Sequence, residues 1–90
     1  MMLLALDTAL DDCAAALLVR EGDAVTVVSE VETIGRGHAE RLMSTVERLM
    51  TRAGATLAAV DAFAVTVGPG SFTGIRVGVA AARGFALAAR

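Results

Sequence analysis

Residues 61–78 read DAFAVTVGPGSFTGIRVG. The first seven form an almost continuous apolar run, which is typical of a strand buried on both faces of a parallel sheet. The tripeptide 68–70, Gly-Pro-Gly, then interrupts the run. A helix is predicted from Ser71 or Phe72 to Arg90, because no stop signal follows. A buried strand that leads through a tight turn into a helix indicates an α/β fold.

The segment before this strand is predicted to be an amphipathic helix over residues 39–53. Its apolar positions recur at spacings of three and four, and Gly54 suits the position after its C-terminus. Three apolar runs precede it, at 2–6, 13–19 and 24–34, and their short connections favour antiparallel strands. The fourth strand returns parallel to one of them through the crossover helix. The predicted order is therefore β-β-β-α-β-α, with three antiparallel strands and then a parallel one in a mixed sheet.

The composition indicates more apolar surface than so short a chain can bury. Of the 90 residues, 56% are apolar, and the mean hydropathy is +0.65. A domain of this size buries only about 60–65% of the surface that its unfolded chain exposes. We therefore expect a partner, or the remainder of a longer chain, to cover the surplus.

Charge and cysteine content exclude several classes of protein. The net charge is −2, with eight arginines and no lysine, so no general attraction to nucleic acid or to a membrane surface is expected. The most apolar stretch, residues 72–89, is interrupted by Arg76 and Arg83 and is short for a membrane span. The single Cys13 excludes an internal disulfide and agrees with a reducing cytosol, so a cytoplasmic location is predicted.

The glycine-rich turn has two interpretations. Free N–H groups at the start of a helix attract anions, and the candidate anion-binding residues are Gly68, Gly70, Ser71, Thr73 and Gly74. No lysine follows the glycines, so the turn is not a Walker A loop. The alternative is a structural turn in which Ser71 caps the helix, and the residues alone favour that alternative.

The last helix is rich in small residues, which allow another backbone to approach closely. Glycine inside a helix costs about 0.5–1 kcal/mol relative to alanine, so its repeated use needs a compensating reason. This face packs either on its own sheet or on a helix of a partner, and the apolar surplus favours the partner. The predicted partner interface consists of Met43, Val46, Met50, Gly74, Gly78 and Ala81.

The remaining candidate residues indicate no complete catalytic or metal site. Asp7 and Thr8 at the end of the first strand could hold a cation or a phosphate, but solvated turn residues are the commoner interpretation. His38 is the only histidine, and the residue four positions later, where a helical metal pair would place its second ligand, is Leu42. Cys13 is interpreted as a small core residue. We therefore predict no catalytic residue, no metal and no cofactor, with weak nucleotide binding left open.

Three stretches of the chain suggest a family. They are LALDTA with CAAAL within residues 4–17, HAERL at 38–42, and GPGSFTGIRVG at 68–78. In these stretches the chain resembles the N-terminal half of the TsaB family, which is needed to make threonylcarbamoyladenosine in tRNA. That family was formerly grouped with the glycoproteases of the M22 peptidase family. The GPGSFTGIRVG stretch is highly specific to this family, whereas the dipeptide Asp7-Thr8 alone would be weak evidence for it.

The resemblance implies an actin-like ATPase fold (ASKHA, related to ribonuclease H), whose core begins with the element order given above. It implies that residues 1–90 form a truncated N-terminal lobe and that a second lobe is absent. It further implies a non-catalytic subunit that pairs with the catalytic subunit TsaD and is joined by the ATPase TsaE. Such a subunit would meet tRNA only through the complex, where TsaD modifies the adenosine next to the anticodon.

Two departures from the catalytic relatives agree with a non-catalytic role. Those relatives carry an HxxxH metal pair, and here Leu42 stands at its second position. The actin-like phosphate hairpin usually has a glycine soon after its aspartate, whereas Thr8 and Ala9 follow Asp7 here, so these residues are taken as a vestigial hairpin. The alternative is an actin-like ATP-dependent transferase or kinase, or an M22-type metallopeptidase. In the absence of a partner we expect a homodimer through helices 39–53 and 72–89.

Overall fold

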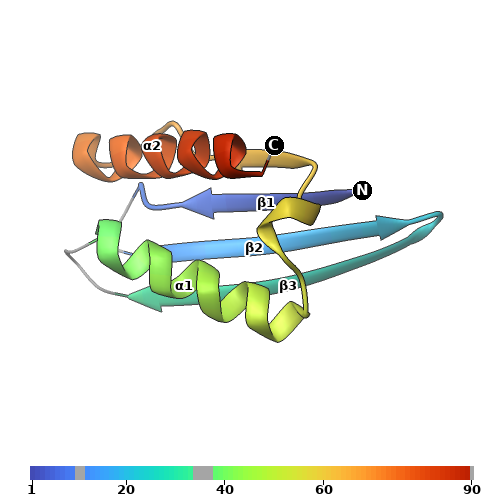
Figure 1. Ribbon diagram of the computed structural model, residues 1–90. Coiled ribbons are helices and arrows are strands. Elements are labelled where there is room, and N and C mark those ends of the chain that lie inside the picture. The colour runs from blue at the N-terminus through green and yellow to red at the C-terminus, as the bar shows by residue number, and fades with distance from the viewer. Residues whose placement is uncertain (10–11, 34–37, 90) are drawn as a thin grey trace.

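The computed structural model describes residues 1–9, 12–33 and 38–89. In this part of the chain one four-stranded sheet has the strand order β3-β2-β1-β4, in which β1 pairs antiparallel with β2 and parallel with β4 (Figure 1). This architecture confirms the predicted α/β fold with its mixed sheet. Its elements are β1 (Met2–Asp7), β2 (Asp12–Glu21), β3 (Ala24–Thr33), α1 (His38–Ala53), a short 3₁₀ turn η1 (Leu57–Ala59), β4 (Ala62–Val65) and α2 (Phe72–Ala88).

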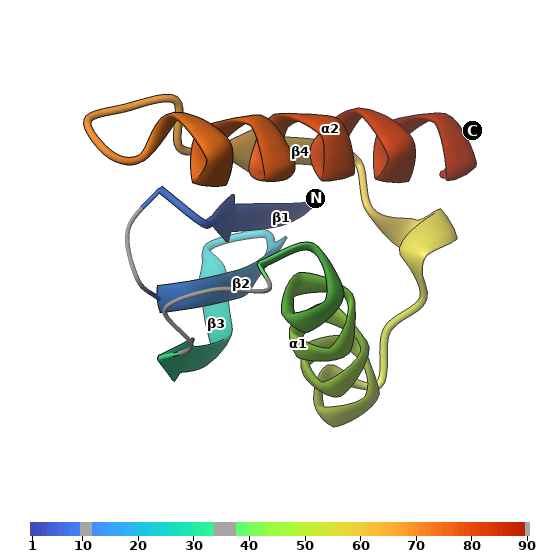
Figure 2. The ribbon, with the colours of Figure 1, turned by 90° about the vertical axis from the view of Figure 1, so that its left-hand side faces the viewer.

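Both helices cover the same face of the sheet. α1 lies against β2 and β3, and α2 lies against β4 and β1 (Figure 2). Alternate residues of β1 and β2 point to this face, as the pleat of a strand requires. The core lies between the two layers and consists of Leu4, Leu6, Cys13, Ala15, Leu17, Leu42, Val46, Leu49, Met50, Val60, Ala82 and Phe85.

The apolar side of β3 faces away from the helices. Val25, Val27 and Val31 are 56%, 59% and 62% exposed. These three valines are separated by even numbers of residues, so they share one face of the strand. Because successive side chains of a strand point to opposite faces, Glu30 and Glu32 lie on the side of β3 that α1 covers.

The prediction that the fourth strand is buried on both faces is wrong. β4 is only four residues long, its Ala64 is exposed and the other three residues are half-buried. The physical reason is its position, since β4 is the outermost strand and both helices lie on one face of the sheet. Ile34 and Arg90, the predicted last residues of the third strand and the second helix, lie outside the described residues. No helix in the described ranges is long and apolar enough to cross a membrane.

Candidate functional site

The glycine-rich turn is fastened to the end of β1. The backbone N–H of Ser71 donates to the carbonyl of Ala9 at 2.6 Å. The hydroxyl of Thr8, which is only 1% exposed, donates to the carbonyl of Gly74 at 2.6 Å. Ser71 is also the N-cap of α2, because its Oγ accepts the backbone N–H of Gly74 at 3.0 Å. We call this set of contacts between residues 8–9 and 71–74 the clasp.

Close packing explains the glycines at the clasp. A Cβ on Gly70 would lie 2.5 Å from the Cβ of Ala9, and one on Gly74 would lie 2.0 Å from the carbonyl oxygen of Thr8. One turn further along α2, a Cβ on Gly78 would lie 2.8 Å from Thr8 Oγ1 and 2.9 Å from Val65 Cγ2. A Cβ atom in a real protein essentially never lies within 3.0 Å of such a neighbour, so a larger residue at any of these three positions would force its surroundings to shift.

These contacts favour the structural interpretation of the turn over the anion-binding one. Two of the N–H groups that would face an anion, those of Ser71 and Gly74, already bond to Ala9 and to the capping hydroxyl. Gly68, Gly70 and Thr73 are exposed. Their predicted role in anion binding stays a prediction.

Asp7 and Thr8 take part in the same local structure. The Oδ1 of Asp7 accepts the backbone N–H of Ala9 at 3.0 Å, which stabilises the turn that follows β1. Of these two side chains, Asp7 is exposed to solvent, whereas Thr8 is buried and its hydroxyl is engaged with Gly74. Among the described residues no group of three or more histidine, cysteine, aspartate or glutamate side chains could hold a metal ion.

A groove of about 330 Å³ lies between α1 and the C-terminal half of α2. Met43 on its rim is 46% exposed, whereas Val46 and Met50 are nearly buried at its base. Phe85 closes it from α2, with its ring stacked on Phe63 at a centroid distance of 6.4 Å. We call this hollow the α1–α2 groove; its lining residues are Met43, Val46, Glu47, Met50, Thr51, Ala55, Leu57 and Phe85.

The structure divides the predicted partner interface into two parts. Met43, Val46 and Met50 come together in the α1–α2 groove, as their helical spacing predicted. Gly74 and Gly78 do not join them, because both are buried against Thr8 of their own chain. This corrects the assignment of these two glycines to an exposed surface, and the alternative of packing on their own sheet is the better one. Ala81 is half-buried against the core.

Sequence reasoning missed the part of the groove that follows α1. Ala55 and Leu57 lie in the connection to β4, where no periodicity marks a buried side. Phe85 had a usable signal, because it follows Gly78 by seven residues and Ala81 by four, which places it near the same side of α2.

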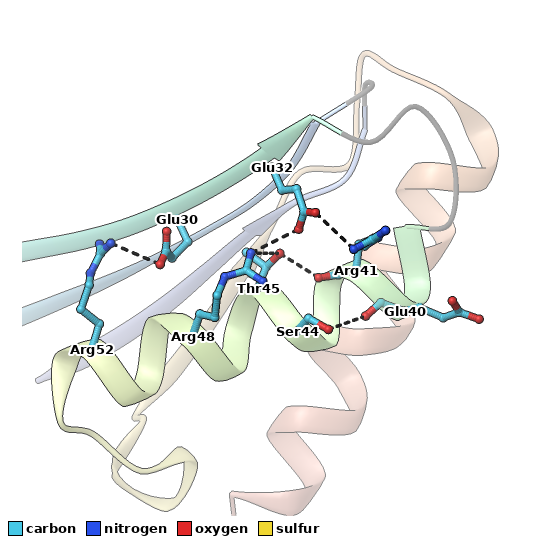
Figure 3. Close-up of polar contacts among 8 residues, drawn as sticks. All are labelled: Glu30, Glu32, Glu40, Arg41, Ser44, Thr45, Arg48 and Arg52. Atoms are coloured by element: carbon cyan, nitrogen blue, oxygen red, sulfur yellow. Dashed lines mark hydrogen bonds and ion pairs between the residues drawn. The ribbon is translucent and has the colours of Figure 1, made fainter.

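A row of ion pairs joins α1 to β3. Arg41 and Arg48 contact Glu32 at 3.4 Å and 3.2 Å, and Arg52 contacts Glu30 at 3.2 Å (Figure 3). The arginines recur along one side of a helix and the glutamates alternate along a strand, so both patterns were visible in the sequence, but their pairing was not. The arginine side chains are about half exposed, so the row guides the docking of α1 more than it stabilises the fold.

Beneath this row, Cys13 is fully buried, which confirms its interpretation as a core residue. Burial raises the pKa of its thiol, while a hydrogen bond with Thr45 opposes the rise; the charge of Glu32 adds to the rise and that of Arg48 opposes it. A buried thiol that keeps its proton is a poor nucleophile.

Comparison with known proteins places the chain in a family. A family model described as "TsaD: tRNA N6-adenosine threonylcarbamoyltransferase" matches residues 27–90. The tRNA threonylcarbamoyladenosine biosynthesis protein TsaB of Escherichia coli K12 is 40% identical over 89 residues, which are 99% of this chain and 37% of that protein. This chain belongs to the family that contains TsaB and TsaD. The resemblance to TsaB in the sequence motifs is thereby confirmed.

Further relatives carry both family names. The tRNA N6-adenosine threonylcarbamoyltransferase of Jannaschia sp. CCS1 is 41% identical over 101 residues, which cover 94% of this chain and 28% of that enzyme. The solved structure of YeaZ from Pseudomonas aeruginosa is 44% identical and superposes with a TM-score of 0.87 over 98% of this chain and 39% of that one. The TsaB-family chain thus spans between a quarter and two fifths of the length of these relatives.

Proposed function

We propose that this chain is a non-catalytic partner subunit in the threonylcarbamoyladenosine modification of tRNA, at the adenosine next to the anticodon. It pairs with a TsaD-like catalytic subunit through the α1–α2 groove. A TsaE-like ATPase joins the pair, tRNA is met only through the complex, and the complex works in the cytoplasm. Without a partner, the same groove joins two copies of the chain.

The groove is the observation that carries the proposal. It combines an exposed methionine, Met43, with an apolar base, and methionine adapts its shape to a partner surface. Glu47 and Thr51 give it a polar rim, as protein interfaces have. An amphipathic helix that lays its apolar side into such a groove is a common mode of recognition.

The chemistry around the strand ends supports a non-catalytic role. Leu42, at the position where the catalytic relatives carry their second metal-binding histidine, is 1% exposed in the core. The Thr8 hydroxyl and the backbone N–H of Gly74, in the first turn of α2, are used within the clasp. These residues offer little means of stabilising the transfer of a phosphoryl or acyl group.

The test is binding of the purified chain to the TsaD-like subunit of the same organism, measured by isothermal titration. Met43 is 46% exposed, so the area that a partner can bury there is worth about 0.7–1.4 kcal/mol. Met43→Glu removes this burial and also places a charge in the groove, so it should weaken binding by at least about 3- to 10-fold. The matched control is Val31→Glu, which alters an equally apolar, exposed residue on the opposite face of the sheet. Equal effects of the two substitutions, or no binding by the native chain, would contradict the proposal.

The catalytic alternative has one specific observation in its favour, because the matching family model and some of the relatives carry the name of the transferase. Two measurements on the isolated chain distinguish this alternative from the non-catalytic role. They are ATP turnover and tight binding of zinc or iron. We expect neither. Turnover that is lost in Ser71→Ala, or stoichiometric metal binding that is lost in His38→Ala, would establish the enzyme instead.

A further inference from the structure

Helix α2 packs on the sheet with a smooth surface. Over its first three turns the described residues of α2 that are buried or pack on the core are mostly glycine and alanine, and only Val77 among them has a side chain larger than a methyl group. They are Gly74, Val77, Gly78, Ala81 and Ala82. Helices normally keep their register because ridges of side chains fit into grooves of the opposing surface. Glycine and alanine provide almost no ridge, so among these residues Val77 alone has a side chain that resists sliding or rotation of α2. The apolar contacts at the start of α2 therefore fix its register only weakly.

The clasp fixes the register of α2 on the sheet at the start of the helix. The Thr8 hydroxyl bonds to the carbonyl of Gly74 at 2.6 Å in a buried position, so the direction and the length of the contact are both fixed. The same hydroxyl oxygen lies where it would meet a Cβ on Gly78 at 2.8 Å. Thr8 thus bonds to the first turn of the helix and occupies the space that a side chain on the next turn would need.

The other end of α2 forms a wall of the α1–α2 groove. Phe85 lines the groove and stacks on Phe63. It follows Gly74 by eleven residues, which corresponds to about 16 Å of helix. A helix of this length is stiff, so a displacement imposed at the clasp is transmitted to Phe85.

We infer that Thr8 is a positioning residue that sets the register of α2 and thereby the shape of the α1–α2 groove. Its consequence for partner binding rests on the proposed function, whereas its effect on the groove does not. The glycines of the GPGSFTGIRVG stretch then serve a geometric purpose, which is to let α2 approach Thr8 closely enough for that contact.

The experiment observes the groove directly in the isolated chain. Of its four methionines, Met43 and Met50 line the groove, so their ε-methyl NMR signals report its shape. Thr8→Val keeps the shape of the side chain and removes the donor, and Thr8→Ser keeps the donor. Gly78→Ala adds a Cβ that must push α2 away by roughly half an ångström to reach ordinary contact, whereas Gly84→Ala on the same helix meets nothing within 4 Å.

The expected result is that Thr8→Val and Gly78→Ala move the signals of Met43 and Met50, while Thr8→Ser and Gly84→Ala leave them in place. Unmoved signals in folded Thr8→Val and Gly78→Ala overturn the inference, as does an equal shift in Gly84→Ala. If Thr8→Val fails to fold, the pair of glycine variants decides, because alanine favours the helix at both positions.

Binding to the TsaD-like subunit separates this inference from the proposed function. If only about a tenth of the molecules of a variant have the groove in its native shape, the apparent affinity for the TsaD-like subunit falls about tenfold. Shifted methionine signals with unchanged affinity leave the positioning role of Thr8 in place and show that the partner binds elsewhere.

Discussion

Replacing Gly74 with alanine tests the clasp most directly. The new Cβ would lie 2.0 Å from the carbonyl oxygen of Thr8 and 2.6 Å from Ser71 Oγ. The nearer atom belongs to the backbone, so it cannot move aside by a change of rotamer. The start of α2 must therefore retreat from β1, which stretches the hydrogen bond between the Thr8 hydroxyl and the Gly74 carbonyl.

The free-energy terms of this substitution have opposite signs. Alanine stabilises the helix relative to glycine by about 1 kcal/mol. Overpacking of a close contact costs about 1–3 kcal/mol, and an unsatisfied buried polar group costs about 1–3 kcal/mol more. The expected net loss in the free energy of unfolding is about 1–5 kcal/mol, centred on about 3 kcal/mol. For a domain of this size each kcal/mol lowers the melting temperature by about 4–8 °C, so the central value corresponds to a fall of about 12–24 °C.

The assay is thermal and urea unfolding followed by circular dichroism, with Gly84→Ala as the control. That residue is exposed and a Cβ there meets nothing within 4 Å, so only the helix term remains and the control gains about 0.5–1 kcal/mol. The reasoning is refuted if Gly74→Ala is as stable as the native chain. It is equally refuted if the two alanine variants change stability by the same amount and with the same sign.

Substitutions at three further residues test other contacts by urea unfolding. Ser71→Ala loses the N-cap of α2 and about 1 kcal/mol, while Ser71→Asp keeps an acceptor and most of the stability; equal losses would argue against the cap. Burial raises the pKa of the Cys13 thiol, so stability is constant below the unfolded thiol's pKa of about 8.5 and declines as the pH rises toward the pKa of the folded state. Cys13→Ala should remove that decline above about pH 8.5, and an unchanged decline would assign it to other groups. Glu32→Gln breaks two ion pairs and costs no more than about 1 kcal/mol, a difference that vanishes near 1 M salt; a larger, salt-independent loss would contradict the weak role given to the row.

The order of elements was predictable because it follows from local patterns. The spacing of apolar residues in 39–53 identifies α1, and the Gly-Pro-Gly break separates β4 from α2. The length of the crossover predicts that β4 runs parallel to one of the first three strands, although it does not identify β1 as that strand. Each of these signals lies within a window of about a dozen residues, which is the range over which periodicity is informative.

The clasp could not be predicted because its two halves are distant in the sequence. Thr8 and Gly74 are separated by 66 positions, and neither has a local pattern that names the other. The glycines therefore suggested a partner helix, whereas the close approach is to the chain's own strand end.

For a related reason, the sequence did not determine which face of β3 the helices cover. Alternation shows that a strand has two different sides but does not show which of them a helix will cover. The arginines of α1 select the side that carries Glu30 and Glu32, and this leaves Val25, Val27 and Val31 exposed.

The pairing of β1 with β4 also has a consequence for the order in which the molecule folds. At the start of this pairing the backbone N–H of Met2 donates to the carboxylate Oδ2 of Asp61 at 2.8 Å, across 59 positions of the sequence. Closing so long a loop costs entropy before any contact is gained, whereas the β2–β3 hairpin closes through the two-residue turn between Glu21 and Ala24. We therefore expect the hairpin and α1 to assemble first and the β1–β4 pair to form last. The clasp belongs to that final step, so the groove takes its shape only when folding is complete.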